Sequence, residues 1–187
     1  MRYFFATELE GPLRPFVYEV MARLKKAYPS QNIRWQDLHK LHLTLQFLGE
    51  INFSQLAHLQ QAISKLSQSF TSFNLTPSRV ELFPGPERPW FIVLGFAACP
   101  KLLQLVAGIR ALACGANIPL SARPFRPHLT LGRAKKQRLT GIDDIIIPKE
   151  LFLPIKRIEL FESQFRAGSS IYRLDTQVIL PEPYYAC

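Results

Sequence analysis

Apolar residues follow a helical spacing in some segments of this chain and gather in short continuous runs in others. An apolar residue at every third or fourth position predicts three helices, at residues 13–28, 54–69 and 101–114. Runs rich in aromatic and β-branched residues predict strands, at residues 3–9, 41–48, 73–83, 90–96, 126–133, 155–161 and 170–180. We expect Ser54 to cap the second helix, Gly115 to end the third, and Ala167-Gly168 to form the turn between the last two strands.

The order of strand, helix and strand occurs in residues 3–48 and again in residues 90–133, with nearly equal spacing between the elements. This order is common in proteins, so spacing alone is a weak signal. Together with the repeated motif described next, it indicates an internal duplication. We therefore expect one two-lobed domain over residues 1–187, whose lobes face each other about a pseudo-twofold axis.

The tetrapeptide His-Leu-Thr-Leu occurs at residues 42–45 and again at residues 128–131. On a strand, the His and the Thr share one face, about 6.6–7 Å apart, while both Leu side chains point the other way. If the two strands meet, His42, Thr44, His128 and Thr130 face one small ligand together. This pattern predicts an acid–base site built around an anion.

The chemistry of these residue types suits in-line displacement at phosphorus. Neutral imidazole accepts a proton and imidazolium donates one, and an unperturbed pKa of about 6.5 makes both forms available near neutrality. One His could take a proton from water while the other protonates the leaving oxygen. Thr44 and Thr130 could donate hydrogen bonds to the non-bridging phosphate oxygens. Such a site requires no metal and no cofactor.

A lone His on a strand is more often a surface or core residue than a functional one, but two identical motifs on matching strands reverse those odds. His39 stands three residues before His42, which could suggest a metal pair; we interpret it as a loop residue and predict no metal site. His58 falls on the second predicted helix, where we expect it to be solvated.

Two arginines flank the second motif, and either could neutralise phosphate charge. Arg126 stands two residues before His128 and shares its face if the strand is regular. Arg133 stands five residues after His128, so strict alternation points it away, unless a bulge at Gly132 turns it back. The alternative for each is an exposed arginine at a strand end.

The composition and net charge indicate which kinds of binding partner suit this chain. The chain has 187 residues, 48% hydrophobic and 20% charged, which is typical of a folded protein, and a net charge of +9. The basic excess favours an anionic partner, nucleic acid or nucleotide, although many small basic proteins bind neither. Four aromatic residues could stack on a base but are more often core residues: Trp35, Phe47, Trp90 and Phe125.

Three widely spaced cysteines without a Cys-x-x-Cys pair argue against a disulfide framework or a thiolate zinc site, so we expect a cytoplasmic protein. No apolar stretch approaches the ~20 residues that span a bilayer, and the N-terminus does not read as a signal peptide. We expect no membrane association and, for this size, a monomer.

The motifs and their flanks resemble the two-histidine phosphoesterase superfamily, and more narrowly the RNA 2′,3′-cyclic phosphodiesterases, also called 2′-5′ RNA ligases. Besides the two tetrapeptides, the resemblance includes Arg34-Trp35, Phe47-Leu48-Gly49, Arg126-Pro127, Gly132-Arg133, Leu160-Phe161-Glu162-Ser163 and Tyr172. It covers essentially the whole chain.

This resemblance implies an α+β fold with two antiparallel sheets around a basic cleft. It also implies hydrolysis of RNA 2′,3′-cyclic phosphate ends to 2′-phosphomonoesters. His42 would be the proton donor to the 3′-oxygen, His128 the proton acceptor from water, and Arg133 the arginine that follows the second motif. Two alternatives stay open: 2′-5′ ligation of RNA at the same site, and a non-catalytic RNA-binding module that kept the fold.

Overall fold

The structure is a computed structural model that describes residues 1–29, 33–85, 90–134, 139, 142, 144–166 and 169–183. The three predicted helices are present as α1 (Leu13–Ala27), α2 (Phe53–Ser67) and α3 (Pro100–Gly115). The expected cap of α2 is wrong. Asn52 caps this helix, because its side chain accepts a hydrogen bond from the Gln55 amide while the Gln55 side chain accepts one from the Asn52 amide. Ser54 only donates its hydroxyl hydrogen to Asn52.

Among the described residues, eight strands form the main sheet, in which β10, β9, β1, β3, β7, β6 and β5 are neighbours in that order and β2 pairs with β7. Their bounds are β1 (Arg2–Glu8), β2 (Arg34–Trp35), β3 (His42–Glu50), β5 (Pro77–Phe83), β6 (Phe91–Phe96), β7 (His128–Arg133), β9 (Arg157–Arg166) and β10 (Ser169–Ile179). A second sheet pairs β4 (Phe73–Leu75) with β8 (Leu153–Ile155). The strand pairs are antiparallel.

The prediction of one strand over residues 73–83 is wrong, because β4 and β5 belong to different sheets. Pro77 begins β5 and has no N–H, so the ladder with β8 cannot continue through it. The two-residue strand β2 falls between the predicted helix at residues 13–28 and the predicted strand at residues 41–48, where no element is predicted. Strands β9 and β10 pair as predicted, and their expected turn at residues 167–168 lies outside the described residues.

The expected duplication is visible in the order of the strands. The first half of the main sheet holds β3, β1, β9 and β10, and the second half holds β7, β6 and β5, so β1 and β6 occupy matching positions, as do β9 and β5. The two halves join between β3 and β7 through one residue pair, Leu43 and Leu129. This arrangement confirms the predicted α+β fold with repeated β-α-β units.

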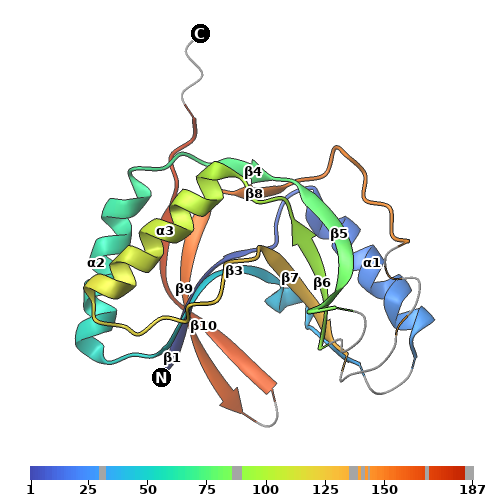
Figure 1. Cartoon of the computed structure of the whole chain (residues 1–187), viewed down its shortest axis with the longest axis horizontal. Coiled ribbons are helices and arrows are strands. Elements are labelled where there is room, and N and C mark those ends of the chain that lie inside the picture. The colour runs from blue at the N-terminus through green and yellow to red at the C-terminus, as the bar shows by residue number, and fades with distance from the viewer. Residues whose placement is uncertain are drawn as a thin grey trace.

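Helices cover one face of the main sheet (Figure 1). In this view α2 and α3 lie together on the side of the first half, and α1 lies on the side of β5 and β6. The four motif leucines point into the core, each at most 1% exposed: Leu43, Leu45, Leu129 and Leu131. Since side chains alternate along a strand, the motif His and Thr residues point to the opposite face. Among the described residues, no helix has the length and apolar character that a membrane crossing demands.

Candidate active site

The two His-Leu-Thr-Leu motifs lie side by side and run in opposite directions. Leu43 pairs with Leu129, so the join between the two halves is also the centre of the site. This arrangement sets His42 on the side of Thr130 and His128 on the side of Thr44. The structure thus brings the four motif residues together on one face.

Both histidines are anchored through the same ring nitrogen. Nδ1 of His42 lies 2.7 Å from the carbonyl oxygen of Lys40, and Nδ1 of His128 lies 2.8 Å from that of Arg126. A carbonyl oxygen only accepts hydrogen bonds, so Nδ1 of each ring carries the hydrogen. Nε2 of each ring is left to accept a proton when the ring is neutral and to donate one when it is charged.

Aromatic side chains surround His42. Its ring centroid lies 5.0 Å from that of Phe4, 5.3 Å from that of Tyr172 in an edge-on contact, and 6.4 Å from that of Phe161. Burial among these rings lowers the pKa of His42, and the charge of His128 lowers this pKa further. The Lys40 carbonyl works in the opposite direction, because it accepts a hydrogen bond from the charged ring.

His128 has different neighbours. Its ring stacks on Phe83 at a centroid distance of 5.6 Å and an angle of 13°. The guanidinium of Arg126 lies 5.0 Å from the centre of the same phenyl ring and is paired with the carboxylate of Glu81 at 2.6 Å. This histidine therefore lies beside an ion pair.

A bulge in β7 turns Arg133 onto the face that carries His128 and Thr130. In the ladder with β6, Val93 pairs with Thr130 and Ile92 with Gly132, so Leu131 is the extra residue. Arg133 then pairs with Phe91, and its guanidinium lies 5.3 Å from the centre of the Phe91 ring. The bulge invoked at Gly132 is present one residue earlier.

The first half repeats this bulge. In the ladder of β3 with β1, Leu45 is the extra residue, and Phe47 occupies the position that Arg133 has in the second half. Phe47 is 66% exposed and its ring lies 5.9 Å from that of Phe4. The pseudo-twofold axis thus relates an exposed aromatic ring to an arginine.

The remaining predicted site residues differ in whether their polar groups have hydrogen-bond or ion-pair partners within the protein. Thr44 and Thr130 are half-buried, and within the described chain their hydroxyls have no hydrogen-bond partner. Arg133 is exposed and has no carboxylate partner among the described residues, whereas Arg126 is engaged by Glu81. Thr44, Thr130 and Arg133 are the groups available to an anion.

Sequence reasoning missed Glu81 and Phe83, although a second repeat points to them. Residues 79–83 read Arg-Val-Glu-Leu-Phe and residues 157–161 read Arg-Ile-Glu-Leu-Phe. These pentapeptides lie on the matching strands β5 and β9. Glu81 is in register with Val93 on β6, and Glu159 with Ala6 on β1, so the second repeat extends the duplication to a third strand in each half.

The other histidines lie outside the motif strands. His39 is exposed in a short 3₁₀-helix (Leu38–Lys40), and His58 is exposed on α2, where the sequence predicts a solvated residue. In the described part of the chain, no three His, Cys, Asp or Glu side chains are grouped as a metal site. Of the four aromatic residues considered for base stacking, Trp35 and Phe125 pack against the core, and Phe47 and Trp90 are exposed.

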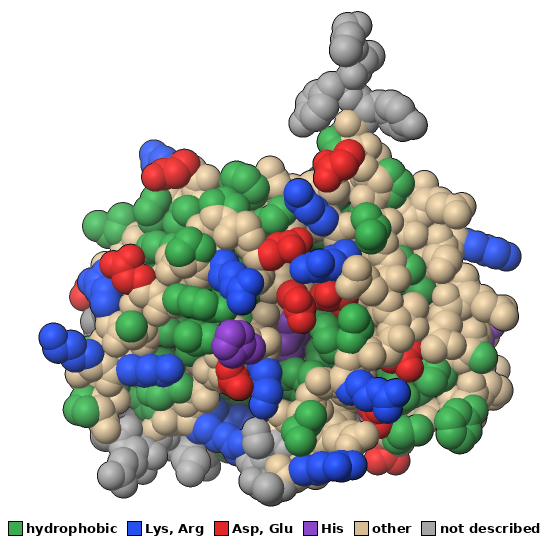
Figure 2. All heavy atoms as spheres, turned by 180° about the vertical axis from the view of Figure 1, so that it is seen from behind, with side chains coloured by type: hydrophobic (Ala, Val, Ile, Leu, Met, Phe, Trp, Pro, Cys, Tyr) green, Lys and Arg blue, Asp and Glu red, His purple; other side chains and the backbone are tan. Residues whose placement is uncertain are grey.

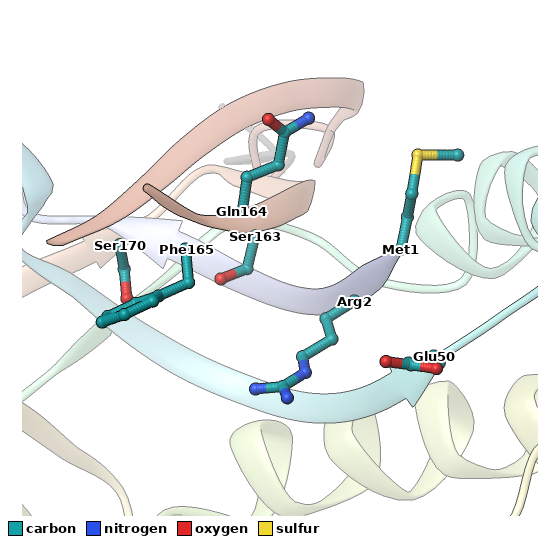
Figure 3. Close-up of a pocket in the computed structure, with 7 residues that line it drawn as sticks. All are labelled: Met1, Arg2, Glu50, Ser163, Gln164, Phe165 and Ser170. Carbon is teal, nitrogen blue, oxygen red and sulfur yellow. The ribbon is translucent and has the colours of Figure 1, made fainter. Parts of the chain in front are cut away.

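On the face seen in Figure 2, histidine side chains are visible near the centre, with basic, acidic and hydrophobic side chains around them. A separate cavity of about 320 Å³ lies at the start of β1 and the far ends of β3 and β9. Figure 3 shows Arg2, Ser163, Phe165 and Ser170 around it, with the phenyl ring beside Ser170. None of the four motif residues lines this cavity, so it is distinct from the paired motifs.

Comparison with known proteins identifies the family of this chain. The model of the LigT-like phosphoesterase family matches residues 9–92 and 96–172. The chain is similar to the RNA 2′,3′-cyclic phosphodiesterase of Escherichia coli K12, with 29% identity over 175 residues that cover 91% of this chain and 92% of the relative.

Solved structures extend the similarity to the whole fold. The crystal structure of TT0787 from Thermus thermophilus superposes with a TM-score of 0.83 and 25% identity, covering 98% of this chain and all of that one. Escherichia coli LigT complexed with 3′-AMP superposes with a TM-score of 0.77 and 26% identity, covering 96% and 97% of the two chains. The resemblance drawn from the motifs is confirmed: this chain belongs to the LigT-like phosphoesterase family.

Proposed function

We propose that this protein hydrolyses RNA 2′,3′-cyclic phosphodiester ends to 2′-phosphomonoesters by metal-independent acid–base catalysis. The observation that carries the proposal is the pair of anchored rings: His42 and His128 share one site, and each has Nδ1 tied to a carbonyl and Nε2 left for proton transfer. In-line attack on phosphorus needs a proton acceptor for water and a proton donor for the leaving oxygen. Two such rings supply both.

In this mechanism His128 accepts the proton of the attacking water and His42 protonates the departing 3′-oxygen. The hydroxyls of Thr44 and Thr130 donate hydrogen bonds to the non-bridging oxygens, where charge develops in the transition state. The guanidinium of Arg133 neutralises the phosphate from the same face. The free hydroxyls and the exposed guanidinium support these roles.

Because the pKa of His42 is lowered in the protein without substrate, the protonation of this ring depends on substrate binding. In the ligand-free protein, burial makes this ring hold its proton less firmly. A bound phosphodiester brings a negative charge close to the ring, which favours the protonated form. The protonated fraction of His42, which is the form that can donate a proton, is therefore larger when the substrate is in place.

The substrate class is supported by the charge of the chain and by its relatives. A net charge of +9 favours an anionic polymer. The similar protein from Escherichia coli is named an RNA 2′,3′-cyclic phosphodiesterase, and the similar structure of Escherichia coli LigT is a complex with 3′-AMP. We extend this substrate class to the present chain.

The test is turnover of a short RNA that ends in a 2′,3′-cyclic phosphate, with the position of the final phosphate determined. We expect a 2′-phosphate product, a rate unchanged by EDTA, and losses of roughly 10²–10⁴-fold in His42→Ala and in His128→Ala. Unchanged turnover in both variants would exclude the acid–base assignment. A 3′-phosphate product would exclude the proposed direction of ring opening.

A further inference from the structure

The repeated pentapeptide places one largely shielded carboxylate two strands away from each motif, Glu81 in the second half and Glu159 in the first. We propose that Glu81 is a positioning residue that fixes the ring of His128 by clamping Arg126. The inference rests on the proposed function, because it assigns how one member of the histidine pair is held. It also gives Arg126 a role other than phosphate binding.

Glu81 makes the contacts that a clamp requires. Its side chain is 12% exposed, and its two oxygens face different partners. Oε1 lies 2.6 Å from Nη2 of Arg126, and Oε2 lies 3.0 Å from Nε of Arg79. The short bond to Arg126 comes from a carboxylate largely shielded from water, so it holds the guanidinium in a fixed geometry. The bond to Arg79 adds little to this, because that side chain is 68% exposed.

A glycine makes room for this carboxylate beside the catalytic strand. Gly95 pairs with His128 in the ladder between β6 and β7. A Cβ at this position would lie 3.0 Å from Oγ of Ser78 and 3.1 Å from Oε1 of Glu81, both closer than most real contacts of that kind. The absence of a side chain at Gly95 lets Glu81 reach across β6 to the residue that precedes β7.

The backbone of Arg126 needs such an anchor because of where it lies. Its carbonyl accepts the Nδ1 hydrogen of His128, yet the residue stands before β7 and outside the ladder. In the first half, the corresponding carbonyl belongs to Lys40, which ends a 3₁₀-helix and whose amide donates to the Asp37 carbonyl at 3.0 Å. A helical turn, together with a hydrogen bond of 3.1 Å from Lys40 Nζ to the Ser170 carbonyl, holds the acceptor for His42. At the acceptor for His128, the ion pair of Arg126 with Glu81 takes the place of the helical turn.

Phe83 ties the clamp to the imidazole directly. Its ring stacks against His128 and also lies under the guanidinium of Arg126. Glu81 and Phe83 are two residues apart on β5, so their side chains share one face of the sheet. Carboxylate, guanidinium, phenyl ring and imidazole form one contiguous unit.

The clamp predicts a defined kinetic signature for Glu81→Gln. This substitution keeps the size of the side chain but removes its charge, so Arg126 is released and its carbonyl no longer fixes the His128 ring. We expect kcat to fall roughly 10-fold with KM unchanged, as is typical when a group that orients a functional histidine is removed. A role of Arg126 on the phosphate would instead raise KM in Arg126→Gln.

Two further variants keep the test decisive even if Glu81→Gln is unstable. Arg126→Gln alters a side chain that is 45% exposed and should lose the same factor in kcat, with no additional loss in the double variant. Arg79→Gln is the matched control, because it removes the other partner of Glu81 and leaves Arg126 in place. We expect its kcat within about twofold of the wild-type value.

A readout without substrate separates this inference from the proposed function. Nitrogen NMR of the neutral imidazoles should show the Nδ1–H form of His128 in the wild type and a mixture of both forms in Glu81→Gln, while His42 stays in the Nδ1–H form. This result would stand even if the RNA assay failed. An unchanged His128 in Glu81→Gln, or a raised KM with unchanged kcat in Arg126→Gln, would overturn the clamp.

Discussion

The two halves of the site place the same residues in matching positions and surround them with opposite chemistry. Around His42 the neighbours are aromatic rings, from Phe4, Phe161 and Tyr172. Around His128 they are one phenyl ring and an ion pair. A duplicated backbone thus supplies two imidazoles at equivalent positions. The difference comes from outside the repeated pentapeptides: Tyr172 on β10 contacts His42, whereas the ion-paired Arg126 lies beside His128.

The repeated carboxylates show the same divergence. Glu81 is bonded to two arginines, which balance its charge. Glu159 lies 3.2 Å from Arg157, but that arginine is shared with Glu8 and Glu10. Burial, together with the charge of Glu8, raises the pKa of Glu159 to about 7. Equivalent positions therefore do not imply equivalent protonation, and the roles of the two halves have to be separated by experiment.

The largest expected effect separates proton donor from proton acceptor. In a cyclic substrate whose bridging 3′-oxygen is replaced by sulfur, the leaving group is a thiolate, which departs without a proton because thiols are far more acidic than alcohols. We expect His42→Ala to recover most of a loss of about 10³-fold on this substrate, and His128→Ala to recover none. The measurement is kcat/KM of each variant relative to wild type, on the oxygen and sulfur substrates.

Recovery in His128→Ala instead would make His128 the proton donor and His42 the proton acceptor. Equal recovery in both variants would mean that neither ring protonates the leaving group. The wild type on both substrates provides the control, since it reports the intrinsic effect of sulfur on the reaction.

The next effect concerns stability and the carboxylate of the first half. In the unfolded chain, Glu159 has a pKa near 4.5, against about 7 in the folded protein. Between these values the folded state binds a proton that the unfolded state does not, so this residue makes stability fall as pH rises from about 4.5 to 7. The loss is on the order of 3 kcal/mol, and Glu159→Gln should remove it. Urea unfolding at several pH values measures the slope.

His42 contributes with the opposite sign over part of this range. Its pKa is lowered in the folded protein, so below pH 6.5 the unfolded chain takes up a proton first, and stability falls as pH drops towards the folded pKa. His42→Gln should therefore steepen the fall of stability with rising pH. A wild-type stability that rose from about pH 5 to pH 7 would contradict the burial of a poorly balanced Glu159.

The sequence was sufficient for features that depend on local pattern. Helical spacing located all three helices, and alternation located the motif strands, because burial on one face controls both periods. The paired histidines were predictable for a further reason: identical tetrapeptides in duplicated units must occupy equivalent positions. That argument needs no knowledge of distant contacts.

Features set by partners far along the chain were not predictable in the same way. The two residues of β2 form a strand only because they pair with β7. The division of residues 73–83 into β4 and β5 depends on the pairing of β4 with β8, which lies about 80 residues further along the chain. The ion pair between Glu81 and Arg126 joins residues 45 positions apart. Its signal was nevertheless present in the repeated Arg-x-Glu-Leu-Phe, which comparison of the two halves would have found.

The smallest expected effect compares the two positions that follow the bulges, Arg133 and Phe47. If Arg133 holds the phosphate, Arg133→Gln should raise KM about 10-fold and reduce the slope of log affinity against log salt by about one, because one counterion-releasing contact is lost. Phe47→Leu removes an uncharged ring and should leave that slope unchanged, and Arg126→Gln should also leave it unchanged, since Glu81 already neutralises that guanidinium. Titrations of a short RNA at several salt concentrations decide the matter. A slope that fell in Arg126→Gln and not in Arg133→Gln would mean that Arg126, and not Arg133, contacts the phosphate. The bulge at Leu131 would then have no part in phosphate binding.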